Sequence, residues 1–81
     1  MSNDKFLEIL VDEYSEQIID IILSNYGHSG RSLNFSRLNQ RLQSLRIDHA
    51  SSTLSEDEWY ELIYELTPDV YDEIYYGRKA A

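Results

Sequence analysis

Acidic residues recur at every fourth position through the first twenty residues of the chain. These five residues are Asp4, Glu8, Asp12, Glu16 and Asp20. On an α-helix a step of four residues advances about 6 Å and turns about 40°, so the carboxylates predict a slowly winding acidic ridge roughly 24 Å long. Like charges at this spacing weaken a helix slightly, so helix stability does not explain the ridge. It is either the solvated face of an amphipathic helix or a docking surface for a positively charged partner.

Length and composition favour one small domain. The chain has 81 residues, of which 42% are hydrophobic, and a formal net charge of −8. It contains no Cys, which excludes disulfides and thiolate sites, and no apolar run of the about 18 residues that span a membrane. The first residues lack the basic and apolar segments of a signal peptide. We therefore expect a single helical domain over residues 1–77, a frayed tail over 78–81 and a cytoplasmic location.

The apolar periodicity predicts an all-α fold, a small bundle of three main helices and a short fourth, at about 4–26, 35–47, 55–66 and 68–76. Ser55 and Glu58 form a capping-box pattern before the third helix, and Pro68 is suited to begin the fourth. Gly27 and Gly77 are expected to end the first and last helices. The residues expected in the core are Phe6, Leu7, Leu10, Val11, Tyr14, Ile18, Ile21, Ile22, Phe35, Leu38, Leu42, Leu45, Trp59, Leu62, Ile63, Leu66, Val70 and Ile74.

Three apolar residues, Ile9, Ile19 and Leu23, lie among the acids of the ridge. Apolar groups between carboxylates favour an interface, because they supply burial where the acids supply attraction. The alternative is that another part of the same small domain covers them. The sequence leaves both interpretations open.

The second expected helix is basic and lies between two acidic segments. Residues 27–50 carry a formal charge of +3, against −5 for residues 1–26 and −6 for residues 51–81. Arg37, Arg41 and Arg46 flank its apolar stripe. Arg, Asn and Gln can read base edges in nucleic acids, but we expect these arginines to cover the core edge and pair with acids of the flanking helices. If they do not, they favour self-association with an acidic face of a second copy.

Residues 45–54 resemble a helix-turn-helix connection, which implies a DNA-binding regulator whose next helix enters the major groove. That next helix opens with three consecutive acids and also carries Glu61 and Glu65. Its carboxylates would meet phosphates, which require cations. Direct nucleic-acid binding is therefore the least favoured function.

The last third of the chain is rich in tyrosine. A rigid ring with a hydroxyl that tolerates water makes tyrosine common at interface hot spots. Together with neighbouring acids, these tyrosines predict a face that binds a basic protein, although half-exposed rings that only cover a small core are the alternative. The residues of this expected face are Tyr60, Tyr64, Tyr71, Asp72, Glu73, Tyr75 and Tyr76.

The segment from Asp72 to Tyr76 resembles the acid-hydrophobic-Tyr-Tyr turn that the four-helix immunity proteins of nuclease colicins present to a basic nuclease. The resemblance is limited to this segment, Gly77 stands where those proteins have a proline, and here the segment lies at the end of the chain. It implies that Tyr75 and Tyr76 anchor a basic partner, with Asp72 and Glu73 beside them.

Motifs for catalysis are missing from the sequence. Neither His28 nor His49 has a Cys or second His at metal-ligand spacing, and neither a nucleophile elbow nor an EF-hand pattern is present. We therefore expect no enzymatic activity, no metal and no cofactor. The favoured function is an acidic interaction module that binds, and in one version inhibits, a basic nucleic-acid-binding protein. Nucleic-acid mimicry is one such version, since a step of about 6 Å is close to the phosphate spacing.

Overall fold

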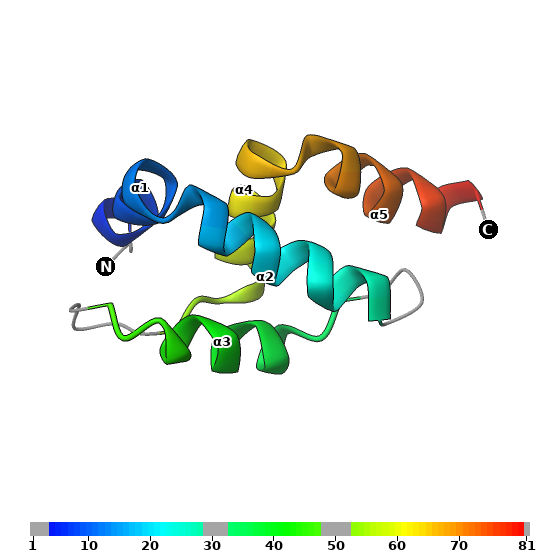
Figure 1. Cartoon of the computed structure of the whole chain (residues 1–81). Helices are drawn as coiled ribbons and strands as arrows, with labels where there is room; N and C mark the ends of the chain where they lie inside the picture. Colours follow the sequence, from blue (N-terminus) through cyan, green and yellow to red (C-terminus); the bar gives the residue numbers. More distant parts are fainter. Residues whose placement is uncertain (1–3, 29–32, 48–52, 81) are drawn as a thin grey trace.

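The computed structural model of the chain describes residues 4–28, 33–47 and 53–80, with side chains at 4–26, 33–47 and 53–75. Within these ranges there is no strand, and the expected all-α fold is confirmed (Figure 1). The expected number of helices differs, because the first predicted helix is divided into two. The helices are α1 (Asp4–Glu13), α2 (Ser15–His28), α3 (Phe35–Ser44), α4 (Glu56–Leu66) and α5 (Pro68–Ala80).

The chain bends at Tyr14, between α1 and α2. In Figure 1, α1 is seen nearly along its axis, whereas α2 runs across the view. Tyr14 bridges the bend, because its N–H donates to the Leu10 carbonyl (3.1 Å) and its carbonyl accepts from the Ile18 N–H (2.9 Å). On one straight helix the buried residues of the two halves would be offset by roughly 65° around the axis. The bend turns both sets toward one core. The sets are Phe6, Leu7 and Leu10 in α1, and Ile18, Ile21 and Ile22 in α2.

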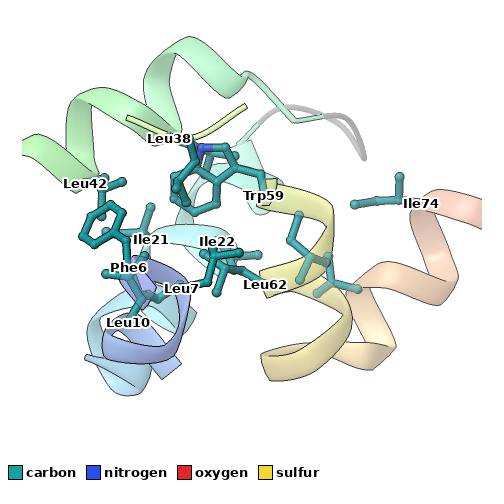
Figure 2. Packing of buried hydrophobic residues seen from close by; sticks show 14 residues of the cluster. Phe6, Leu7, Leu10, Ile21, Ile22, Leu38, Leu42, Trp59, Leu62 and Ile74 are labelled. Atoms are coloured by element: carbon teal, nitrogen blue, oxygen red, sulfur yellow. The ribbon is translucent and has the colours of Figure 1, made fainter. Parts of the chain in front are cut away.

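All five helices contribute to a single hydrophobic cluster, whose largest side chain is the fully buried Trp59. Figure 2 shows the Trp59 ring next to Leu38 of α3, and Phe6 of α1 next to Leu42 of α3. Most of the expected core is confirmed as buried, and Leu54, which precedes α4, joins it. The expected core residues that are only half-buried, packed at the edge of the cluster, are Val11, Tyr14, Phe35, Leu45 and Leu66.

Asn39 of α3 links that helix to the start of α4. Its side-chain oxygen accepts hydrogen bonds from the Leu54 N–H (2.8 Å) and from the indole N–H of Trp59 (3.0 Å). Its amide nitrogen donates to the Leu54 carbonyl (3.0 Å). Asn39 is half-buried, and it therefore holds two segments together at the edge of the core and is not part of the exposed polar face of α3.

The starts of α4 and α5 follow local chemistry, whereas several helix ends differ from the prediction. Ser55 and Glu58 form the predicted capping box, with bonds of 2.9 and 3.3 Å, and α5 begins at Pro68 as expected. Helix α3 ends at Ser44, three residues before the expected end, and Arg46 then adopts a positive φ of 55°. Helix α5 continues through Gly77 to Ala80, so the prediction that Gly77 ends it is wrong. Glycine weakens a helix by about 1 kcal/mol but does not force it to end.

Two further sequence expectations concern segments at the limits of the description. Helix α2 extends through Gly27 to His28, so the prediction that Gly27 ends it is wrong. The rest of the expected turn, residues 29–32, lies outside the described residues. The same holds for residues 48–52, in the middle of the segment that resembles a helix-turn-helix connection. No helix in the described part of the chain is long and apolar enough to cross a bilayer.

Candidate protein-interaction groove

A groove of about 690 Å³ lies between α1 and α4, and α5 contributes one side chain, Tyr71, to it. Among the described residues that line it there is no Lys, Arg or His. Six of these lining residues are acidic. They form the α1 acid row (Asp4, Glu8 and Asp12) and the α4 acid row (Asp57, Glu61 and Glu65). The other six form the apolar lining, which consists of Leu7, Val11, Tyr60, Leu62, Tyr64 and Tyr71.

The two acid rows are built in the same way. In each row the acids are four residues apart, so they follow one side of the helix, and all six are exposed. On both helices an acid precedes a lining apolar residue by three positions, as in Asp4 and Leu7 or Glu61 and Tyr64. Residues three apart are neighbours on a helix surface. Each helix therefore presents an acidic edge next to an apolar surface, and the two helices face the same groove.

The tyrosines of the lining meet at Tyr71. The Tyr71 ring lies edge-on to Tyr64 (5.1 Å between centroids) and to Tyr60 (6.5 Å), which joins α5 to α4. It also stacks on Tyr75 within α5 (5.9 Å), and Tyr60 in turn contacts Phe35 of α3 (5.5 Å). Ring pairs of this kind contribute about 0.5–1.5 kcal/mol each beyond area burial. The tyrosines of the lining are thus held by contacts with one another, while Tyr64 remains 62% exposed to solvent.

The acidic ridge expected from the sequence is not continuous. Its first three acids line the groove as the α1 acid row, but the bend at Tyr14 places Glu16 and Asp20 on α2, where they are exposed and do not line it. The prediction of one straight helix over residues 4–26 is therefore wrong, because the core requires two helix directions. Whether Glu16 and Asp20 take part in binding stays a prediction.

The apolar residues within the ridge do not reach the groove either. Ile9 and Ile19 are half-buried, and Leu23 is 48% exposed. None of the three lines the groove or packs against the hydrophobic cluster. Whether they form part of an interface stays a prediction.

The expected tyrosine and acid face is divided between the groove and the outer side of α5. Tyr60, Tyr64 and Tyr71 line the groove. The other residues belong to α5 but do not line the groove in the described structure: Asp72, Glu73 and Tyr75 are exposed, and the side chain of Tyr76 lies outside the described residues.

Two contacts connect this outer part of α5 with the rest of the protein. The Tyr26 hydroxyl donates to the Glu73 carboxylate (3.0 Å) and so links α2 to α5. Tyr75, 47% exposed, stacks on Tyr71, so the aromatic surface continues from the groove onto the outer side of α5.

The arginines of α3 and its C-terminal end are exposed. Within the described ranges, no carboxylate forms an ion pair with Arg37, Arg41 or Arg46. The internal pairing expected for these arginines is therefore not found in this part of the structure. Asn39, beside them in sequence, is engaged with Leu54 and Trp59, which removes it from any base-reading surface on this helix.

The α4 acid row was missed as part of a site when only the sequence was considered. Glu61 and Glu65 stood out as charges unsuited to DNA, but their spacing with Asp57 repeats that of the α1 acid row and was an available signal. In the described residues no three His, Asp or Glu side chains come together in a way that would hold a metal ion. The acids are arranged in rows, and their chemistry is that of an extended anionic surface.

No protein-family model matches the chain, and comparisons with curated proteins and with solved structures find no significant match. The function therefore has to be inferred from the groove.

Proposed function

We propose that this chain is a non-enzymatic interaction module that binds a basic protein partner in the groove between α1 and α4. The observation that carries the proposal is the lining itself, in which six exposed carboxylates, with no cation among the described lining residues, accompany apolar side chains. Val11 and the three tyrosines are half-buried or exposed, whereas Leu7 and Leu62 are buried in the core. Charge of one sign steers an oppositely charged partner and sets its orientation. The apolar lining supplies the burial that charge alone does not provide.

The partner we favour is a protein that itself binds nucleic acid. Such proteins carry clustered Lys and Arg that neutralise phosphates, and two rows of carboxylates with a helical step of about 6 Å offer a comparable series of negative charges. A module seated on that basic surface would compete with nucleic acid, which makes inhibition one version of the proposal. The cytoplasmic location expected from the sequence belongs to the same proposal.

The proposal is tested by affinity capture with matched variants. The tagged protein is incubated with a nuclease-treated lysate of the organism that encodes it, and bound proteins are identified by mass spectrometry. The groove variant carries Glu8→Gln, Glu61→Gln and Glu65→Gln. The control variant carries Glu16→Gln, Asp20→Asn and Asp72→Asn, which removes the same charge at exposed positions that do not line the groove.

We expect the wild type and the control variant to capture a basic nucleic-acid-binding protein that is released by salt, and the groove variant to lose it. Equal capture by both variants would place the binding surface elsewhere and refute the groove. Recovery of the bait alone would refute a foreign partner.

Self-association is the second candidate, and one observation favours it. Arg37 and Arg41 are exposed one turn apart on α3 and have no ion pair within the described residues. They are thus available to the acidic groove of another copy, in a head-to-tail contact that builds rings or filaments. Under this candidate Arg37→Glu with Arg41→Glu abolishes self-association in sedimentation experiments. Under the first candidate the same change leaves binding of the foreign partner largely intact.

DNA binding through α3 is the third and least favoured candidate. It requires association at low salt that falls steeply as salt rises. The hydrogen bonds of Asn39 to Trp59 and Leu54 and the acids of α4 both weigh against it.

A further inference from the structure

We infer that the occupant of the groove is a basic amphipathic α-helix of the partner, with cations on both flanks of an apolar stripe. This inference rests on the proposed function and specifies the kind of segment that the groove receives. It follows from three properties of the groove. These are the acids and apolar groups on both of its walls, the four-residue repeat of its acids, and the absence of a strand edge in its described walls.

The first property is that a docked segment has to meet an acid row on each wall and the apolar lining as well. The α1 acid row comes from one wall and the α4 acid row from the other, and each wall also contributes apolar side chains to the lining. An extended strand has only two faces, which alternate along the chain. A strand that satisfied both acid rows would have no side chains left for the lining. A helix projects side chains all around its axis, so one helix can present cations to both rows and an apolar stripe to the lining.

The second property is the matching repeat. Each acid row has three carboxylates at four-residue spacing, which covers about 12 Å of helix axis. Cations four residues apart on a docked helix would advance by the same step as the acids they meet. A segment of about three turns is enough to span the row. The 62% exposed ring of Tyr64 adds a face on which an Arg or Lys of that segment can be placed by cation–π attraction.

The third property is the absence of a backbone edge. Both walls of the groove are α-helices, whose backbone N–H groups beyond the first turn are bonded within the helix, and the described residues contain no strand to which a peptide could be added. A docked segment therefore has to satisfy its own backbone hydrogen bonds when it leaves water. A helix does so, and an extended peptide does not.

The basic helix of this same protein does not meet these requirements. Helix α3 carries Arg37 and Arg41, but its apolar residues Leu38 and Leu42 are buried in its own core. Its exposed side chains between residues 36 and 44 are all Ser, Gln or Arg. It offers charge without an apolar stripe, so a second copy is the weaker occupant and a helix of a different protein is the one we propose.

The experiment uses two synthetic peptides of identical composition and about 15 residues, long enough for four helical turns. In the first, Lys and Arg lie at four-residue spacing on both sides of a Leu stripe. In the second, the same residues are reordered so that cations and Leu alternate with the two-residue period of a strand. Binding to the full chain is measured by isothermal titration calorimetry at about 150 mM salt, which screens weak surface contacts, and the peptide's helicity by circular dichroism. The groove and control variants described above are titrated in parallel.

We expect the helical-pattern peptide to bind at least about ten-fold more tightly than its reordered isomer, a difference of about 1.4 kcal/mol. It should gain helicity on binding and lose at least about ten-fold in affinity with the groove variant but not with the control variant. Equal affinities of the two peptides, both reduced by the groove variant, would overturn the helix inference and leave the proposed function standing. Binding that the groove variant does not reduce, or no binding of either peptide at about 1 mM, would overturn both.

Discussion

The indole N–H of Trp59 donates a hydrogen bond to the side-chain oxygen of Asn39 over 3.0 Å. This contact joins the largest buried side chain of the protein, on α4, to the middle of α3. The same oxygen also accepts from the Leu54 N–H. One amide group thus provides hydrogen bonds for two N–H groups that would otherwise lose their hydrogen bonds to water when they are buried. Asn39 thus allows a tryptophan with a polar nitrogen to be packed completely.

Replacing Asn39 by Ala should lower the free energy of unfolding by about 2–4 kcal/mol, because the partners on Leu54 and Trp59 would be left without their hydrogen bonds. The measurement is urea unfolding followed by the fluorescence of Trp59. Gln40→Ala is the matched control, since Gln40 is the next residue of α3 and is exposed. It should change stability by less than about 0.5 kcal/mol. Similar losses in the two variants would contradict the role assigned to Asn39.

Arg46→Gly should raise the free energy of unfolding by about 0.5 kcal/mol. Arg46 adopts a positive φ of 55° after α3, a conformation in which a side chain is strained and glycine is not. Glycine's larger freedom in the unfolded state offsets part of this gain. Arg46→Ala removes the same charge but keeps the Cβ atom, so it should give no increase. Thermal unfolding of the three proteins under one condition distinguishes strain from charge.

Tyr71 should stabilise the folded protein through its ring and not through its hydroxyl. Tyr71→Phe keeps the contacts with Tyr60, Tyr64 and Tyr75 and should alter the free energy of unfolding by less than about 0.5 kcal/mol. Tyr71→Ala removes all three contacts and should cost about 2 kcal/mol. Tyr64→Ala, at a ring that is 62% exposed, should cost less than half of that. A loss for Tyr71→Phe equal to that for Tyr71→Ala would show that the hydroxyl carries the effect.

Removing a central charge from an acid row should stabilise the protein while it weakens binding of a basic partner. Glu61 lies four residues from both Asp57 and Glu65, so Glu61→Gln relieves two like-charge pairs, each worth about 0.2–0.5 kcal/mol. The gain should shrink as NaCl is raised. The control is the same Glu61→Gln change in a protein that already carries Asp57→Asn and Glu65→Gln, because both like-charge neighbours four residues away are then absent. A salt-independent gain, or an equal salt dependence in the control, would argue against repulsion within the row.

Much of the fold could be predicted because it depends on neighbouring residues. The Ser55 capping box and Pro68 determine where α4 and α5 begin, and both signals are local. The bend at Tyr14 was missed because every residue from 4 to 26 suits a helix. Only the position of the common core decides that one straight helix would turn Ile18 away from the face that Leu10 occupies. The continuation of α5 through Gly77 was missed because glycine permits an end without requiring one.

The sequence could predict the residues of part of the groove but not how they come together, for a related reason. The α1 acid row and the tyrosines carried a recognisable pattern, whereas their meeting depends on α1 packing against α4 and on Tyr71 of α5 reaching across to Tyr60. The spacing of Asp57 and Glu61 was visible, but nothing local indicated that it faced another row. Conversely, Asn39 is of a residue type common on protein surfaces, yet it is half-buried because it bonds to Leu54, fifteen positions away.

The acid rows also affect the free protein. Their carboxylates repel one another, and no cation among the described lining residues neutralises them. Helices α1 and α4 nevertheless pack against each other, so the repulsion is a cost that folding has to overcome. A partner that brings cations to the rows relieves that cost, so its binding should also raise the free energy of unfolding.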